Sequence, residues 1–105
     1  ISEDNKLENV YRLKIMNNSE QAQTYQVKVV GDDAFEVEFQ EDKTQPIAKA
    51  QYQVKVQPGK DQSLVMEVKV PDGVLSLGSH PILFQVKSLD TQEATTEKSV
   101  FIITQ

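Results

Sequence analysis

Apolar and polar residues alternate with a period of two along most of this chain. In the first such run Tyr11, Leu13 and Ile15 are apolar, whereas the residues between them are charged. This alternation is typical of a β-strand with one buried face and one face in water. Turn-forming pairs such as Pro58-Gly59 separate the runs. The pattern predicts seven strands, close to residues 11–15, 25–29, 35–39, 52–56, 64–70, 82–86 and 98–104.

The segments between the runs suggest how the strands are connected. The polar segment NNSEQAQ follows the first run, so we expect the first two runs to form a hairpin or one edge of a sandwich. The segment EDKTQP, residues 41–46, is a polar break after the third run. The last run is nearly continuous in apolar residues from Val100 to Ile103. Such a run is typical of a strand that is covered on both faces or paired centrally.

These features predict an all-β fold with almost no helix, because no window shows apolar residues at helical spacing. Seven short antiparallel strands in about 100 residues fit an immunoglobulin-like or fibronectin-like β-sandwich. The cysteine pair and the tryptophan of antibody domains are missing, which favours the fibronectin-like side of this class. The length of 105 residues predicts a single domain over residues 1–105. Because the chain opens on Ile1 and not on Met, we expect it to be a piece of a larger protein.

Charge and composition exclude several classes of function. Acidic residues outnumber basic residues by 16 to 11, the net charge is −5, and the basic residues are scattered singly. Nucleic acids and anionic membrane surfaces attract clustered Lys and Arg, so we predict neither as a partner. With no cysteine, residues 1–105 hold no thiolate nucleophile, cysteine-ligated zinc or iron–sulfur cluster. No apolar run approaches the roughly 20 residues of a membrane-spanning helix.

Few side chains are candidates for chemistry. His80 is the only histidine, which rules out a site with several histidine ligands in one copy of the chain. Met16, Met66 and His80 are together a possible Cu(I) ligand set, although they lack a ligand spacing. Met66 has the same parity as Leu64 and Val68, so we expect it in the core. We predict no catalytic residue and no metal ligand, and we keep this copper site as an alternative.

Carboxylates occur in pairs without the pattern of a ligand loop. An EF-hand alternates acidic or amide residues around a Gly and ends on a distal Glu, and no segment does this. Glu36 and Glu38 lie on the polar face of an alternating run, where we expect them to be solvated and to protect a strand edge from pairing. We assign no role to the glycosylation sequon Asn17-Asn18-Ser19. The pairs are Glu3/Asp4, Asp32/Asp33, Glu36/Glu38 and Glu41/Asp42.

Three segments together resemble the C-terminal immunoglobulin-like domain of the FixG (CcoG) family, the cytochrome c oxidase accessory proteins. They are NVYRLKIMNNSEQAQTYQVKVVG, PGKDQSLVMEVKVP and LGSHPILFQV, and the resemblance covers residues 8–103. Their common features are N-x-Y-x-L-K-I-x-N, a Tyr-x-Val-x-Val-x-Gly strand, a Pro-Gly turn, a V-x-V-P strand end and a Gly before I-x-F-x-V.

The resemblance implies a parent in the bacterial inner membrane that carries 4Fe-4S clusters and assists oxidase assembly and copper handling. This piece is then a C-terminal domain on the periplasmic side, without a cofactor of its own. We expect a non-catalytic docking or scaffold domain with an oxidase assembly component as its protein partner. Two alternatives stay open: a copper-binding domain, and an unrelated fibronectin-like spacer of a surface protein. The sequence predicts no oligomeric state.

Overall fold

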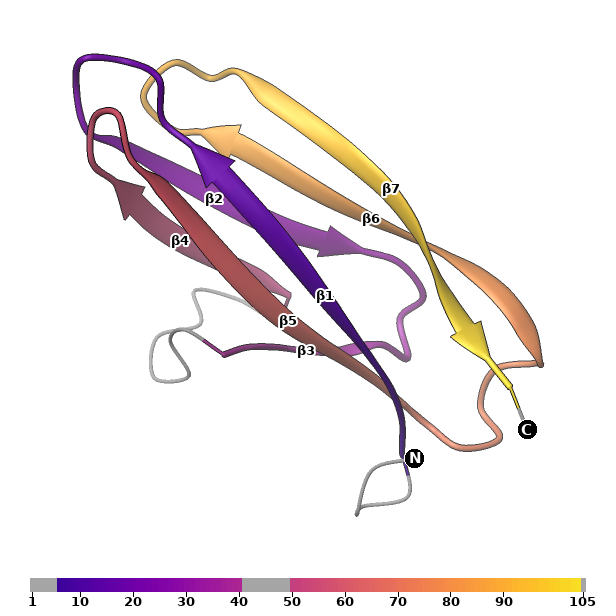
Figure 1. Ribbon diagram of the computed structural model, residues 1–105. Helices are drawn as coiled ribbons and strands as arrows, with labels where there is room; N and C mark the ends of the chain where they lie inside the picture. The colour runs from indigo at the N-terminus through magenta and orange to yellow at the C-terminus, as the bar shows by residue number, and fades with distance from the viewer. Residues whose placement is uncertain (1–5, 41–49, 105) are drawn as a thin grey trace.

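The computed structural model describes residues 6–40 and 50–104 (Figure 1). Within these ranges there are seven β-strands and no helix, as the alternation predicted. All strand pairs are antiparallel. The strands are β1 (Lys6–Met16), β2 (Gln23–Val30), β3 (Glu36–Phe39), β4 (Gln51–Val56), β5 (Asp61–Pro71), β6 (Gly78–Ser88) and β7 (Ala94–Ile103).

The strands form two sheets, which pack face to face as a sandwich (Figure 1). One sheet has three strands in the order β1-β5-β3, and the other has four in the order β4-β2-β6-β7. The prediction of an immunoglobulin-like sandwich is therefore confirmed. Strands β1 and β7 are edge strands of different sheets, and backbone contacts between them place them on the same side of the sandwich.

The core consists of the inward-facing residues of both sheets. On β5 the predicted inner positions Leu64, Met66, Val68 and Val70 are all buried. Three aromatic pairs also join the two halves of the sandwich. Their ring centroids lie 4.9 to 5.1 Å apart, a distance at which aromatic contacts add to the energy of burial. The pairs are Tyr11–Phe84, Phe35–Phe101 and Phe39–Tyr52.

Of the two expectations for the first two runs, a hairpin or an edge of a sandwich, the hairpin is wrong. β1 pairs with β5, whereas β2 pairs with β4 and β6, so the chain crosses from one sheet to the other between them. The side chain of Asn17 explains the crossover. Its Nδ2 donates to the carbonyls of Gln21 and of Val56 on β4, at 2.9 and 3.0 Å. These bonds hold the connection over the end of the sandwich. The other expectation is confirmed for the first run, because β1 is an edge strand of the sandwich.

The expectation that the last run is central or covered on both faces is also wrong. β7 is an edge strand, and its outer residues Val100 and Ile102 remain 44% and 47% exposed. Its inner residues Phe101 and Ile103 are buried, as in the other strands. A run of apolar residues therefore does not by itself indicate a central strand here.

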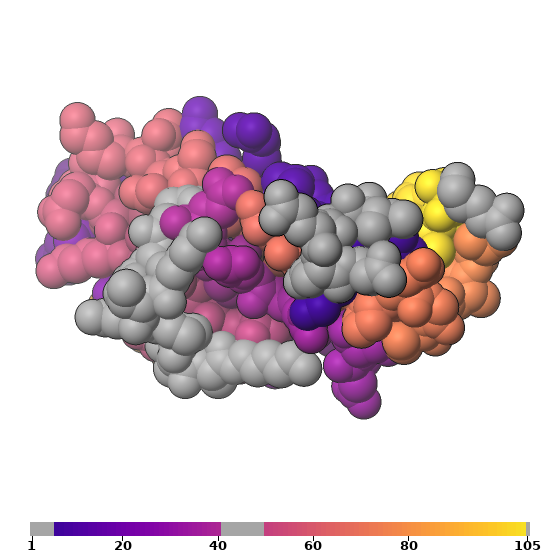
Figure 2. Space-filling model, turned by 90° about the horizontal axis from the view of Figure 1, so that it is seen from below, coloured from indigo at the N-terminus to yellow at the C-terminus, as the bar shows by residue number. Residues whose placement is uncertain are grey.

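The two ends of the sandwich differ. The β1–β2, β4–β5 and β6–β7 loops lie at one end, and the start of β1 and the end of β7 lie at the other (Figure 1). Seen from the latter end, the last residues of β7 lie beside residues of the β5–β6 turn and β6 (Figure 2). Exposed Val74 and Leu77 belong to that turn.

Some expectations fall outside the described part of the chain. They are the polar break at residues 41–46 and the pairs Glu3/Asp4 and Glu41/Asp42. In the described residues no helix has the length and apolar character needed to cross a membrane.

Candidate functional site

The three possible copper ligands do not come together. Met66 is 1% exposed in the core, whereas Met16 is 59% exposed at the end of β1. Met66 pairs with Tyr11 in the β1–β5 ladder, and Tyr11 lies five residues before Met16 on β1. At about 3.4 Å per residue, the two methionines are roughly 17 Å apart along the strand direction. His80 is in the other sheet, where its Nε2 is 2.7 Å from the carbonyl oxygen of Ser76.

The carboxylates that the structure describes have local partners or face water. Asp32 accepts a hydrogen bond of 2.9 Å from the amide of Ala34 and so shapes the turn before β3. Glu36 forms an ion pair of 2.5 Å with Lys6. In residues 6–40 and 50–104 no three His, Asp or Glu side chains are grouped as a metal site.

The most distinctive surface feature is the seam, the line along which the edge strands β1 and β7 face each other. The seam is closed near the start of β1. There the Tyr11 hydroxyl donates to the Val100 carbonyl at 2.8 Å, and Asn9 Nδ2 lies 3.5 Å from the Ile102 carbonyl oxygen. Burial raises the pKa of the Tyr11 phenol.

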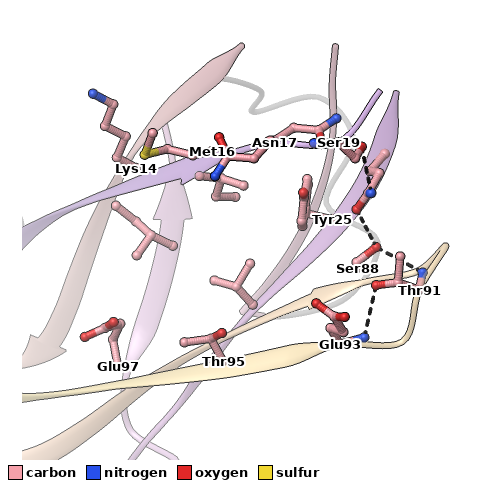
Figure 3. Close-up of a pocket in the computed structure, with 15 residues that line it drawn as sticks. Lys14, Met16, Asn17, Ser19, Tyr25, Ser88, Thr91, Glu93, Thr95 and Glu97 are labelled. Atoms are coloured by element: carbon pink, nitrogen blue, oxygen red, sulfur yellow. Dashed lines mark hydrogen bonds between the residues drawn. The ribbon is translucent and has the colours of Figure 1, made fainter. Parts of the chain in front are cut away.

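Beyond Tyr11, toward the β1–β2 loop, the seam opens into a groove of about 650 Å³ (Figure 3). In the close-up, Lys14 and Met16 lie on one side, Thr95 and Glu97 on the other, and Tyr25 between them. We call this the seam groove. It is lined by residues 13–19, by Gln23 and Tyr25 of β2, by Val86 and Ser88 of β6, and by Thr91, Glu93, Thr95 and Glu97.

The alternation along β7 explains why a groove exists. Thr95 and Glu97 have the same parity as buried Phe101 and Ile103, so their side chains face between the sheets. They are polar and exposed, however, and do not close the sandwich. The apolar residues Leu13 and Val86 are therefore only half-buried in this part of the molecule.

A chain of hydrogen bonds fixes the end of the groove (Figure 3). Gln23 Nε2 donates to Ser19 Oγ, and Ser88 Oγ donates to Gln23 Oε1, at 2.9 and 3.0 Å. The amide of Thr91 donates to Ser88 Oγ, and the amide of Glu93 donates to Thr91 Oγ1. These bonds connect the β1–β2 loop to the β6–β7 loop, so the groove is held open by a polar frame.

The charges of the seam groove are unevenly distributed. On the β1 side, Lys14 Nζ is 3.2 Å from Asp61, which partly neutralises it. On the β7 side, Glu93 and Glu97 form no ion pair with any described residue. The β7 side therefore carries two carboxylates that a cationic group could approach.

The sequence alone did not reveal this site. Its two sides come from segments that are far apart in the sequence, residues 13–19 and 91–97. A hairpin, one of the two expectations for the first two runs, would have placed β1 beside β2 instead of near β7. One signal was present: the run ATTEKSVFII has polar residues at the inner positions of its first half and apolar residues at those of its second half. That change indicates a strand with only half of its inner face buried.

Comparisons with known proteins agree with the fold. Residues 1–104 match the family model described as "IG-like fold at C-terminal of FixG, putative oxidoreductase". The crystal structure of a FixG-related protein from Vibrio parahaemolyticus is similar, with a TM-score of 0.76 and 22% identity over 94% of this chain and 81% of that chain. No curated protein sequence matches the chain. The chain thus belongs to the family of immunoglobulin-like domains found at the C-terminus of FixG.

Proposed function

We propose that this chain is a non-catalytic docking domain of a FixG-type iron–sulfur membrane protein. In this proposal it lies on the periplasmic side of the bacterial inner membrane and binds a component of cytochrome c oxidase assembly or copper handling. Family membership supports the FixG part of the proposal and removes the alternative of an unrelated spacer module. Because the chain has no cysteine, the cysteine ligands of 4Fe-4S clusters belong to other parts of the parent.

The seam groove is the observation that supports docking most directly. It combines half-buried apolar residues with hydrogen-bonding groups and two carboxylates at its side. Recognition sites commonly have this mixture, since apolar surface supplies binding energy and polar groups fix orientation. The copper-binding alternative gains no support from the positions of Met16, Met66 and His80.

Two neighbouring threonines allow a matched test. The side chain of Thr95 lines the groove, whereas the side chain of Thr96 points to the opposite face of β7. In respiring bacteria that make the full-length parent, Thr95→Trp should fill the groove and reduce copurification of an oxidase subunit or copper chaperone. Thr96→Trp should leave the amount of copurified partner unchanged. Equal copurification with both variants, or none with the unmodified protein, would contradict the proposal.

A further inference from the structure

We infer that the partner enters the seam groove as an extended peptide segment, pairs with the free edge of β7 as an added strand, and places a Lys or Arg beside Glu97. This inference rests on the proposed docking function and specifies the partner chemistry. Addition of a strand to an exposed sheet edge is a common mode of peptide recognition.

The backbone of β7 supports this mode of binding. The carbonyl of Glu93 accepts a hydrogen bond from the amide of Ser88 on β6, whereas the carbonyl of Val100 accepts one from Tyr11 on β1. Odd-numbered residues of β7 therefore direct their backbone groups to β6, and even-numbered residues direct theirs to the seam. Accordingly Thr96 and Lys98 present N–H and C=O groups to the seam, where no described strand pairs with them.

The facing strand has a matching arrangement. The amide of Asn17 donates to the carbonyl of Lys60, at the end of the β1–β5 ladder. By alternation, odd-numbered residues of β1 bond to β5, and Lys14 and Met16 direct their backbone groups to the seam. Both sides of the groove thus offer main-chain donors and acceptors to an inserted segment.

Side-chain chemistry specifies the segment. A strand beside β7 has every second side chain between the sheets, facing half-buried Leu13 and Val86. Apolar side chains fit these positions. The position directly opposite Glu97 also points inward, and opposite charges across a strand pair are favourable. The preferred segment therefore has an apolar residue and a Lys or Arg two positions apart.

The groove does not favour a second copy of this chain as its occupant. The chain carries a net charge of −5, and two copies would repel each other. A symmetric antiparallel pairing of two β7 strands centred on Thr95, which lines the groove, would place Glu97 opposite Glu93 of the other copy. A basic segment from another protein fits the charge better.

The test uses this chain and three nine-residue peptides. The first alternates Thr with Val and has Lys at one inward position, the second has Glu in place of Lys, and the third is the first peptide with N-methylated backbone amides. Binding is followed by NMR, with amide hydrogen exchange of Thr96 and Lys98 as the readout of strand pairing. We expect the Lys peptide to bind and to slow exchange at both amides, and the N-methylated peptide not to bind.

Charge reversal provides the matched control. Glu97→Lys should lower the affinity for the Lys peptide and raise the affinity for the Glu peptide. Each change should be roughly two- to fivefold, which is the size of one cross-strand charge pair. Gln53→Lys, at an exposed position of β4 on the opposite edge of the same sheet, introduces a lysine away from the groove and should leave the preference for the Lys peptide unchanged. No binding, binding without slower exchange at Thr96 and Lys98, or an unchanged preference in Glu97→Lys would overturn the inference. Self-association of the chain through β7 in sedimentation would also overturn it.

The two proposals fail in different ways. If the peptides do not bind but Thr95→Trp still removes the oxidase component, docking stands and the partner uses a folded surface. If the peptides bind but Thr95→Trp has no effect in cells, strand addition stands and the oxidase-related role is wrong.

Discussion

The hydroxyl of Tyr11 on β1 donates a 2.8 Å hydrogen bond to the carbonyl of Val100 on β7. This bond joins the edge strands of the two sheets, and the seam groove opens beyond it. The Tyr11 ring also contacts Phe84 of the other sheet, with ring centroids 5.0 Å apart. Tyr11 therefore closes one part of the seam and marks where the groove begins.

Removal of the Tyr11 hydroxyl should destabilise the domain. Tyr11→Phe keeps the ring contact but loses the bond to Val100, so we expect the free energy of unfolding to fall by about 0.5–1.5 kcal/mol. Urea unfolding followed by circular dichroism measures this difference. Tyr25→Phe, in a half-buried tyrosine of β2, is the control and should change stability less. Equal losses in both variants would contradict the role given to the Tyr11 bond.

The same residue predicts a dependence on alkaline pH. Burial raises the pKa of Tyr11 in the folded state, so folding favours the neutral phenol. Its contribution to stability is fully present below about pH 10, the ordinary pKa of tyrosine, and is lost as the pH rises through the higher folded pKa. In urea unfolding from pH 8 to pH 11, the free energy of unfolding should fall more steeply with pH in the unmodified chain than in Tyr11→Phe. Parallel declines would contradict this.

Asn17 should be essential to the frame of the groove. It is 1% exposed, its Nδ2 donates two hydrogen bonds, and its Oδ1 accepts a bond from the amide of Ser19 at 2.9 Å. Asn17→Ala leaves buried partners unsatisfied, so we expect a loss of about 2–3 kcal/mol in unfolding free energy. Exposed Asn18→Ala is the control, with an expected change within about 0.5 kcal/mol. Similar stability of the two variants in thermal or urea unfolding would show that the side-chain bonds do not hold the loop.

Copper binding gives another clear expectation. Because Met66 is in the core and far along the strand from Met16, we expect no tight, stoichiometric Cu(I) binding in an anaerobic titration against a competing chelator. Met16→Leu and His80→Ala should behave like the unmodified chain. Tight 1:1 binding that both substitutions abolish would instead support the copper-binding alternative.

The sequence predicted the strands and the core because these depend on local alternation. Met66 and its neighbours on β5 are buried as their parity required. Sheet membership was harder to predict, because the polar segment after β1 suits either a hairpin or a crossover. Contacts between residues distant in sequence distinguish the two, among them the pairing of β1 with β5 and the bond from Asn17 to Val56, 39 residues away.

The groove was harder still to predict, because it depends on two edges that are distant in sequence. The partners Tyr11 and Val100 are separated by 89 positions. Val100 and Ile102 suggested a central strand, yet edge position leaves them nearly half exposed. Family resemblance predicted the fold but supplied no site residue, so the groove came from the structure.

Site-specific photo-cross-linking tests the central claim of docking through the seam groove most directly. A photoreactive amino acid replaces Thr95 in the groove or, as a control, exposed Gln53 on β4 at the opposite edge of the sheet, in the full-length parent in respiring bacteria. We predict that the Thr95 position cross-links to an oxidase subunit or a copper chaperone and that the Gln53 position does not. Cross-links to such a partner from Gln53 alone would contradict docking through the groove.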